Sequence, residues 1–155
     1  MKAKLILMIL MTGTLLSCGG DDFISEAEQL EKDIAIIDQF LAANSIDAIK
    51  DPSGLRYQIL QEGTGKKPTL NNTIEATFQG RLLETGVVFD QATVPASFPM
   101  PAVIRGWQIG FQLFPEGTAA VLYIPSGLGF GKTGSGGTIP PNANLIFEVE
   151  LIAVK

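Results

Sequence analysis

The fold of this chain is decided by the stretch Val103-Ile104-Arg105-Gly106-Trp107-Gln108-Ile109-Gly110-Phe111. Although two glycines interrupt it, its apolar spacing predicts a short buried helix. On both sides of it the sequence changes to short segments of alternating or apolar residues, separated by turn residues. These predicted strands are Leu55–Leu60, Ile74–Leu83, Val87–Phe89, Ala119–Ile124 and Leu145–Val154. One short helix among several strands predicts an α+β fold, with an antiparallel sheet curled around the helix.

Several motifs stand in a fixed order around this stretch. They are Gly63-Thr64-Gly65, Gly86-Val87-Val88-Phe89-Asp90, Val103-Ile104-Arg105-Gly106-Trp107, Ile139-Pro140-Pro141-Asn142-Ala143-Asn144-Leu145 and Phe147-Glu148-Val149-Glu150-Leu151. Together they resemble the FK-binding-protein (FKBP) type of peptidyl-prolyl cis–trans isomerase, over residues 55–155. The resemblance implies an FKBP-like antiparallel sheet around a short helix. It also implies an enzyme that accelerates X-Pro isomerisation during the folding of exported proteins.

The resemblance further implies an apolar pocket floored by Trp107. The residues carried over as catalytic are Asp90, the one polar side chain inside, with Phe89, Trp107, Ile104, Phe147 and Phe130. Those carried over as substrate-binding are Phe78, Phe98 at the rim, Val103 and Ile139. The backbone N–H of Ile104 would hold a substrate carbonyl.

Two positions depart from the family pattern. Members commonly carry tyrosine where this chain has Phe78 and Phe130. Each substitution keeps the ring and loses a hydroxyl hydrogen bond, with a net effect of about 0.5–1.5 kcal/mol. The alternative function is therefore a catalytically weak or inactive FKBP-fold binding or chaperone module.

Composition excludes several other functions. The chain has 155 residues, no histidine and one cysteine, Cys18. It therefore forms no intramolecular disulfide, zinc finger or histidine-based triad. The net charge of −5 argues against nucleic acid, which requires a basic surface. Rotation about an X-Pro bond needs no proton transfer, because its barrier comes from C–N resonance. No metal or cofactor is implied, and the expected partners are proline-containing polypeptides.

The first residues are typical of an exported lipoprotein. Lys2 and Lys4 precede the apolar run Leu5–Leu16, which is short for a membrane span. Leu15-Leu16-Ser17-Cys18 resembles the bacterial lipobox. We predict a signal peptide at 1–17, cleaved before a lipidated Cys18, and a membrane anchor in the bacterial cell envelope, at the periplasmic face or cell surface. The alternative is a free cysteine buried in a short hydrophobic helix.

Residues 18–54 are predicted to carry the lipid anchor, a helix and a linker. Ser25 and Glu28 fit a capping box, and an apolar face follows at Leu30, Ile34, Ile37 and Leu41. This predicts an amphipathic helix over 25–43. It either folds back on the domain or serves as a stalk, or it pairs with a partner, including a second copy in a homodimer. Residues 51–54 are typical of a turn at a domain boundary.

Overall fold

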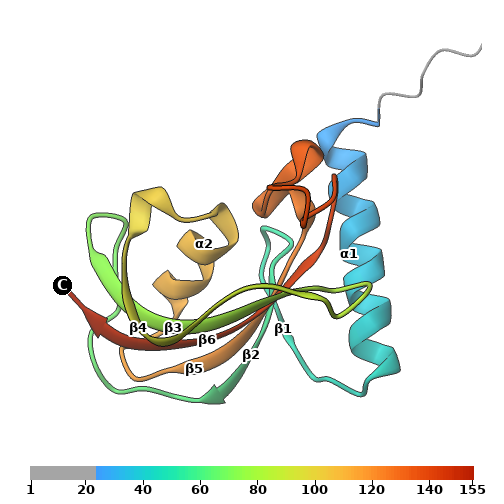
Figure 1. Cartoon of the computed structure of the whole chain (residues 1–155). Coiled ribbons are helices and arrows are strands. Elements are labelled where there is room, and N and C mark those ends of the chain that lie inside the picture. The colour runs from blue at the N-terminus through green and yellow to red at the C-terminus, as the bar shows by residue number, and fades with distance from the viewer. Residues whose placement is uncertain (1–23) are drawn as a thin grey trace, which may run out of the picture.

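Residues 24–155 are described by the computed structural model, and they form one sheet with two α-helices (Figure 1). The predicted signal peptide at 1–17 and Cys18 lie outside the described residues. The helices are α1 (Glu26–Ala43) and α2 (Arg105–Leu113), and three short 3-10 helices are η1 (Met100–Ala102), η2 (Ser126–Leu128) and η3 (Gly131–Thr133). The strands are β1 (Ile49–Lys50), β2 (Arg56–Gln61), β3 (Thr73–Leu82), β4 (Val88–Pro99), β5 (Ala119–Ile124) and β6 (Leu145–Val154).

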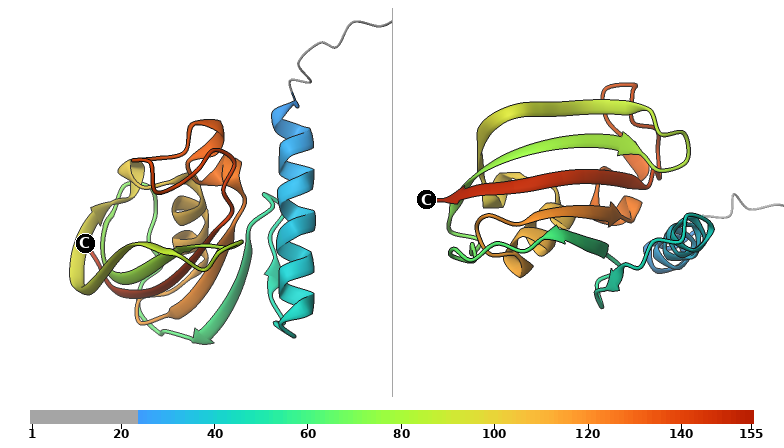
Figure 2. Two further views of the ribbon diagram at one scale, coloured as in Figure 1. Left: turned by 45° about the vertical axis from the view of Figure 1, so that its right-hand side comes forward. Right: turned by 90° about the horizontal axis from the view of Figure 1, so that it is seen from below.

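The sheet is antiparallel throughout and has six strands in the order β1-β2-β5-β6-β3-β4. Its two faces alternate along β6, because successive side chains of a strand point to opposite sides. Phe147 and Val149 are buried in the main core with α2, whereas Glu148 and Glu150 are exposed. Figure 2 shows α2 within the curl of the sheet and α1 outside it. The predicted α+β class is confirmed.

Two glycines let α2 lie close against β5. A Cβ at Gly106 would come within 2.6 Å of Ile124, and one at Gly110 within 3.0 Å of Leu122. The absence of both side chains brings Trp107 down onto the sheet. The helix begins at Arg105, two residues later than predicted, because Ile104 has extended backbone angles and serves as its N-cap.

Helix α1 is docked on the outer face of the sheet. The predicted capping box is present, with Ser25 and Glu28 bonded to each other in both directions. Ile37 and Leu41 are buried in a second apolar cluster with Val121, Tyr123 and Ile146 of the sheet, together with Leu83. Of the alternatives for the helix, the structure shows the one in which it folds back on the domain. No helix within 24–155 combines the length and apolar character needed to cross a membrane.

Strand β4 is much longer than the predicted segment Val87–Phe89. It is an edge strand that pairs only with β3, and its register shifts at two places. Pro95 and Pro99 lie within it. Proline has no N–H to donate and is tolerated at a sheet edge. The prolines and the bulges hide the alternating pattern by which a strand is recognised in sequence.

Candidate functional site

The side chain of Trp107 is the centre of an aromatic cluster inside the curl of the sheet. Its ring centroid lies 5.1 Å from that of Phe78, 5.4 Å from Phe98, 5.3 Å from Phe147 and 5.1 Å from Phe111. All four contacts are edge-to-face, an arrangement that aromatic rings favour. Trp107 is only 4% exposed. These rings therefore hold the indole in one orientation.

The cluster continues toward the surface through Phe89 and Phe130. The ring of Phe89 lies 5.5 Å from Phe147 and 6.4 Å from Phe130, again edge-to-face. Gly80 makes this packing possible, because a Cβ there would come within 2.7 Å of both Phe147 and Phe89. We call the residues around Trp107 the aromatic site: Phe78, Phe89, Phe98, Val103, Ile104, Trp107, Phe130 and Phe147. Apart from Trp107 and Phe147, its members are only half-buried, so they present apolar surface to solvent.

The backbone at the start of α2 includes one N–H group that has no acceptor within residues 24–155. The carbonyl of Ile104 accepts from the N–H groups of Trp107 at 3.0 Å and Gln108 at 3.1 Å. The Gln108 side chain donates back to the carbonyl of Val103 at 2.9 Å, which ties the preceding residues to the helix. Within residues 24–155 the N–H of Ile104 meets no acceptor. A peptide carbonyl placed against the aromatic site could accept from it.

The predicted apolar site residues belong to one packed cluster. Beside the aromatic site, Ile139 is buried in the same core, and it exchanges two backbone hydrogen bonds with Ser135, at 2.9 and 3.0 Å. Ile139 therefore fixes the loop after η3. Phe98, at the end of β4, contacts both Phe78 and Trp107. The structure brings these side chains together, and their roles toward a substrate stay predictions.

Asp90 departs from the expectation of a polar group enclosed in the pocket. It lies opposite Gly80 on the edge strand and is exposed to solvent. Its Oδ1 accepts the backbone N–H of Gln91 at 2.8 Å. The family resemblance implies that a tyrosine hydroxyl at position 78 helps to orient this aspartate, and Phe78 has no hydroxyl to do so.

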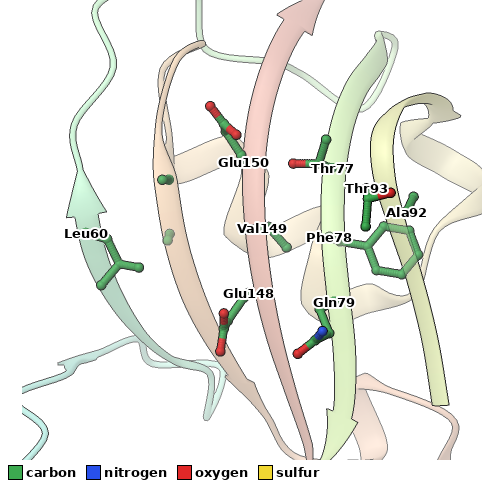
Figure 3. A pocket seen from close by; sticks show the side chains of 11 residues that line it. Leu60, Thr77, Phe78, Gln79, Ala92, Thr93, Glu148, Val149 and Glu150 are labelled. Carbon is green, nitrogen blue, oxygen red and sulfur yellow. The ribbon is translucent and has the colours of Figure 1, made fainter. Parts of the chain in front are cut away.

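The opposite face of the sheet carries a different kind of hollow (Figure 3). Its volume is about 310 Å³, and its lining residues come from β2, β3, β4, β5 and β6. Thr77 lies opposite Glu150 and Gln79 opposite Glu148 on neighbouring strands, and Arg81 pairs with Glu148 at 2.6 Å. The hollow is open, and its lining combines apolar residues such as Leu60 and Val149 with the exposed carboxylates of Glu148 and Glu150.

One buried charged residue was missed by the sequence analysis. Asp33 of α1 is 1% exposed and bonds to Ser126, which begins η2. The signal is its spacing, three residues after Leu30 and four before Ile37, which puts a carboxylate on the apolar face of the helix. A charged residue at such a position requires a buried partner. Within 24–155, no group of three acidic or cysteine side chains is placed to hold a metal.

Known proteins resemble this chain in sequence and in fold. A family model described as FKBP-type peptidyl-prolyl cis-trans isomerase matches residues 64–152. The chain is 42% identical over 120 residues to the probable FKBP-type peptidyl-prolyl cis-trans isomerase FkpA of Neisseria meningitidis serogroup B, covering 74% of this chain and 44% of that protein. It is 39% identical over 133 residues to the outer membrane protein MIP of Legionella longbeachae, covering 83% of this chain and 57% of that protein.

A solved structure covers most of the chain. The crystal structure of a peptidyl-prolyl cis-trans isomerase from Pseudomonas syringae pv. tomato superposes with a TM-score of 0.71 at 36% identity, covering 81% of this chain and 95% of that one. The chain spans about half the length of the curated relatives it matches.

Proposed function

The chain belongs to the FKBP-type peptidyl-prolyl cis-trans isomerase family, and from that premise we propose that it accelerates cis–trans isomerisation of X-Pro bonds in polypeptides. The observation that carries the proposal is the aromatic site, where the half-buried rings of Phe78 and Phe98 pack on Trp107 and present apolar surface to solvent. Beside it, the N–H of Ile104 has no acceptor within residues 24–155. That arrangement combines an apolar surface for the proline ring with a donor for a neighbouring carbonyl.

The proposed chemistry suits a site without an acid or a base. The barrier to rotation, about 18–20 kcal/mol, comes from C–N resonance, which is lost in the twisted state. Resonance separates charge, so an apolar surface stabilises the planar amide less than water does. The twisted amide loses less on entering, and surface complementary to it lowers the barrier. Phe89, Phe130 and Phe147 would exclude water, and Ile104 N–H would hold the chain in register.

The proposed substrates are proline-containing segments of exported proteins during folding. The rings beside Trp107 favour a bulky apolar residue before the proline, because it buries apolar area against them. Isomerisation of X-Pro bonds takes tens of seconds or longer without a catalyst, so it limits folding in many chains.

The test compares one substitution on the two faces of the molecule. Phe89→Leu removes a ring from the aromatic site, and Phe40→Leu removes a half-buried ring of α1 that packs on Tyr123 of the outer cluster. With the whole chain in mild detergent and a Leu-Pro test peptide, we expect Phe89→Leu to lower kcat/KM by about tenfold or more. Phe40→Leu should leave it nearly unchanged. Absence of acceleration by the folded wild type would refute the proposal.

A second candidate is a binding module that holds proline-containing segments without catalysis. It is favoured by the phenylalanines at 78 and 130 and by the exposed position of Asp90. Asp90 remains a predicted catalytic residue, so Asp90→Val separates the two. If the wild type accelerates isomerisation and Asp90→Val does so less, the result supports an isomerase in which Asp90 contributes to catalysis. Peptide binding by a wild type that does not catalyse supports the module.

We also propose that Cys18 carries the lipid anchor after removal of residues 1–17, with residues 18–54 joining it to the isomerase domain at 55–155. The lipobox-like sequence supports this, as does the relative named an outer membrane protein. The protein would then lie on a membrane of the bacterial envelope. In cells supplied with labelled palmitate, the wild type should take up label and Cys18→Ser should not. Label in neither protein would count against the anchor.

Pairing of two copies through the helix at 25–43 would need its outward side, because Ile37 and Leu41 are buried against the sheet of the same chain. Ile36 is 41% exposed on that helix. If such a dimer forms, Ile36→Glu should reduce the mass measured by light scattering from two copies to one. An unchanged mass would exclude a dimer that forms through Ile36.

A further inference from the structure

We propose that Asp33 is a positioning residue for the aromatic site, acting through Ser126 and the loop that carries Phe130. The proposal rests on the isomerase function proposed above. It assigns part of the site to α1, which precedes the residues 64–152 matched by the family model.

The Asp33 carboxylate is buried, and both of its oxygens accept hydrogen bonds. Oδ2 of Asp33 accepts from the backbone N–H of Ser126 at 2.9 Å and from its hydroxyl at 2.5 Å. Oδ1 accepts from the Gln29 side chain at 2.7 Å. Ser126 itself is fully buried. Hydrogen bonds to a charged acceptor are stronger and more directional than neutral ones.

Ser126 is where the loop leaves the sheet. It follows the end of β5, where Ile124 packs against Gly106 beside Trp107. The N–H of Gly129 donates to the carbonyl of Ser126 at 2.9 Å, and Phe130 follows directly. The position of Ser126 thus sets the direction in which the loop brings the Phe130 ring to Phe89.

Beyond Ser126, α1 gives the loop little other support. A cleft of about 510 Å³ lies between the first turns of the helix and the loop, lined by residues that include Leu30, Gly131 and Lys132. Asp33 therefore supplies the polar contact that fixes the loop to the helix. Without it, two buried donors of Ser126 would lose their acceptor, and the loop would move to recover one.

A second anchor on the same helix serves as the matched control. Asp38 pairs with Arg56 at 2.8 Å and Lys50 at 2.9 Å, at the β1–β2 edge of the sheet. It holds α1 without touching the loop. If α1 only stabilises the fold, neither substitution should change the activity of a folded variant, whereas a positioning role predicts an effect of Asp33 on activity.

The experiment measures kcat/KM for a Leu-Pro peptide with the whole chain, at a temperature where every variant is folded. Small displacements of a site wall are costly to rate, so we expect Asp33→Asn to lower kcat/KM about tenfold and Asp38→Asn less than about twofold. Because Asp33 acts through Phe130, we expect Asp33→Asn to have little further effect in a Phe130→Leu background.

Ser126→Ala keeps the N–H and loses the hydroxyl, so it should show a smaller loss with the same dependence on Phe130. It decides the matter if Asp33→Asn does not fold. Equal losses in the wild-type and Phe130→Leu backgrounds would overturn the proposal, as would an Asp33→Asn rate equal to that of the wild type. An inactive wild type would instead refute the isomerase function.

Discussion

The two helices lie on opposite faces of one sheet and are held there by different means. Helix α2, inside the curl, approaches β5 through Gly106 and Gly110 and carries Trp107 into a cluster of rings. Helix α1, outside, is held by an apolar cluster that includes Ile37 and Leu41 and by the carboxylates of Asp33 and Asp38. The difference shows how alternation along a strand such as β6 separates an apolar working face from an anchoring face.

The largest effect is expected from Trp107→Ala, inside the curl. Removing a buried tryptophan leaves a large cavity and costs about 3–5 kcal/mol of unfolding free energy. The four rings around it would also lose their common contact, so catalysis should vanish with it. Urea unfolding and the peptide assay measure both. Retained catalysis in this variant would mean that the rings around Trp107 are core and nothing more.

On the outer face, Ile37→Ala should also lower the free energy of unfolding. Ile37 is fully buried between α1 and the sheet, and such truncations cost about 2–5 kcal/mol. The loss should appear in urea unfolding. A cost close to zero would show that α1 does not dock on the sheet in solution.

The N–H of Ile104, at the start of α2, can be removed by a substitution that changes little else in the backbone. Ile104 has φ −58° and ψ 153°, so its backbone suits proline. Val103 is extended, as the residue before a proline must be. Ile104→Pro deletes the N–H, whereas Ile104→Ala keeps it and shortens the side chain. We expect kcat/KM to be about 3- to 10-fold lower for proline than for alanine, the value of one hydrogen bond. Equal rates would show that this N–H does not hold the substrate.

The smallest effect concerns the Asp38 anchor. The hydrogen bond from Arg56 lowers the pKa of Asp38 below its usual 3.8, and Lys50 acts in the same direction. A depressed pKa in the folded state adds stability above the unfolded pKa, and this is lost as the pH falls through the folded value. For a partly exposed pair we expect about 0.5–1 kcal/mol.

The measurement is urea unfolding of wild type and Asp38→Asn between pH 7 and pH 2.5. The wild type should be more stable near neutral pH, and the difference should shrink below about pH 4. A difference that persists unchanged at the lowest pH would point to packing at this position instead of charge.

Sequence reasoning did well where local signals are strong. The capping box of Ser25 and Glu28 placed the start of α1, and continuous apolar segments gave β5 and β6 their observed bounds. The family resemblance identified the aromatic residues of the candidate site. In the structure the rings of Phe78, Phe98 and Phe147 contact Trp107.

It did less well for features that depend on contacts between residues far apart in the sequence. The length of β4 depends on pairing with β3, which tolerates prolines at an edge. The exposure of Asp90 depends on its place on the edge strand, opposite Gly80 of β3. The role of Asp33 depends on Ser126, which is 93 positions away in the chain. The spacing of Asp33 places its carboxylate on the apolar face of α1, but it does not identify Ser126 as the partner.

The most direct test of the central claim uses the fact that Trp107 is the chain's single tryptophan. Its fluorescence reports on the aromatic site without any label. Titration with a Leu-Pro peptide should change the emission saturably, with half-saturation at the peptide concentration that gives half-maximal isomerisation rate. Phe40→Leu should behave the same, and Phe89→Leu should weaken both. Catalysed isomerisation with no change in Trp107 emission would contradict the account, because the reaction would then take place elsewhere on the molecule.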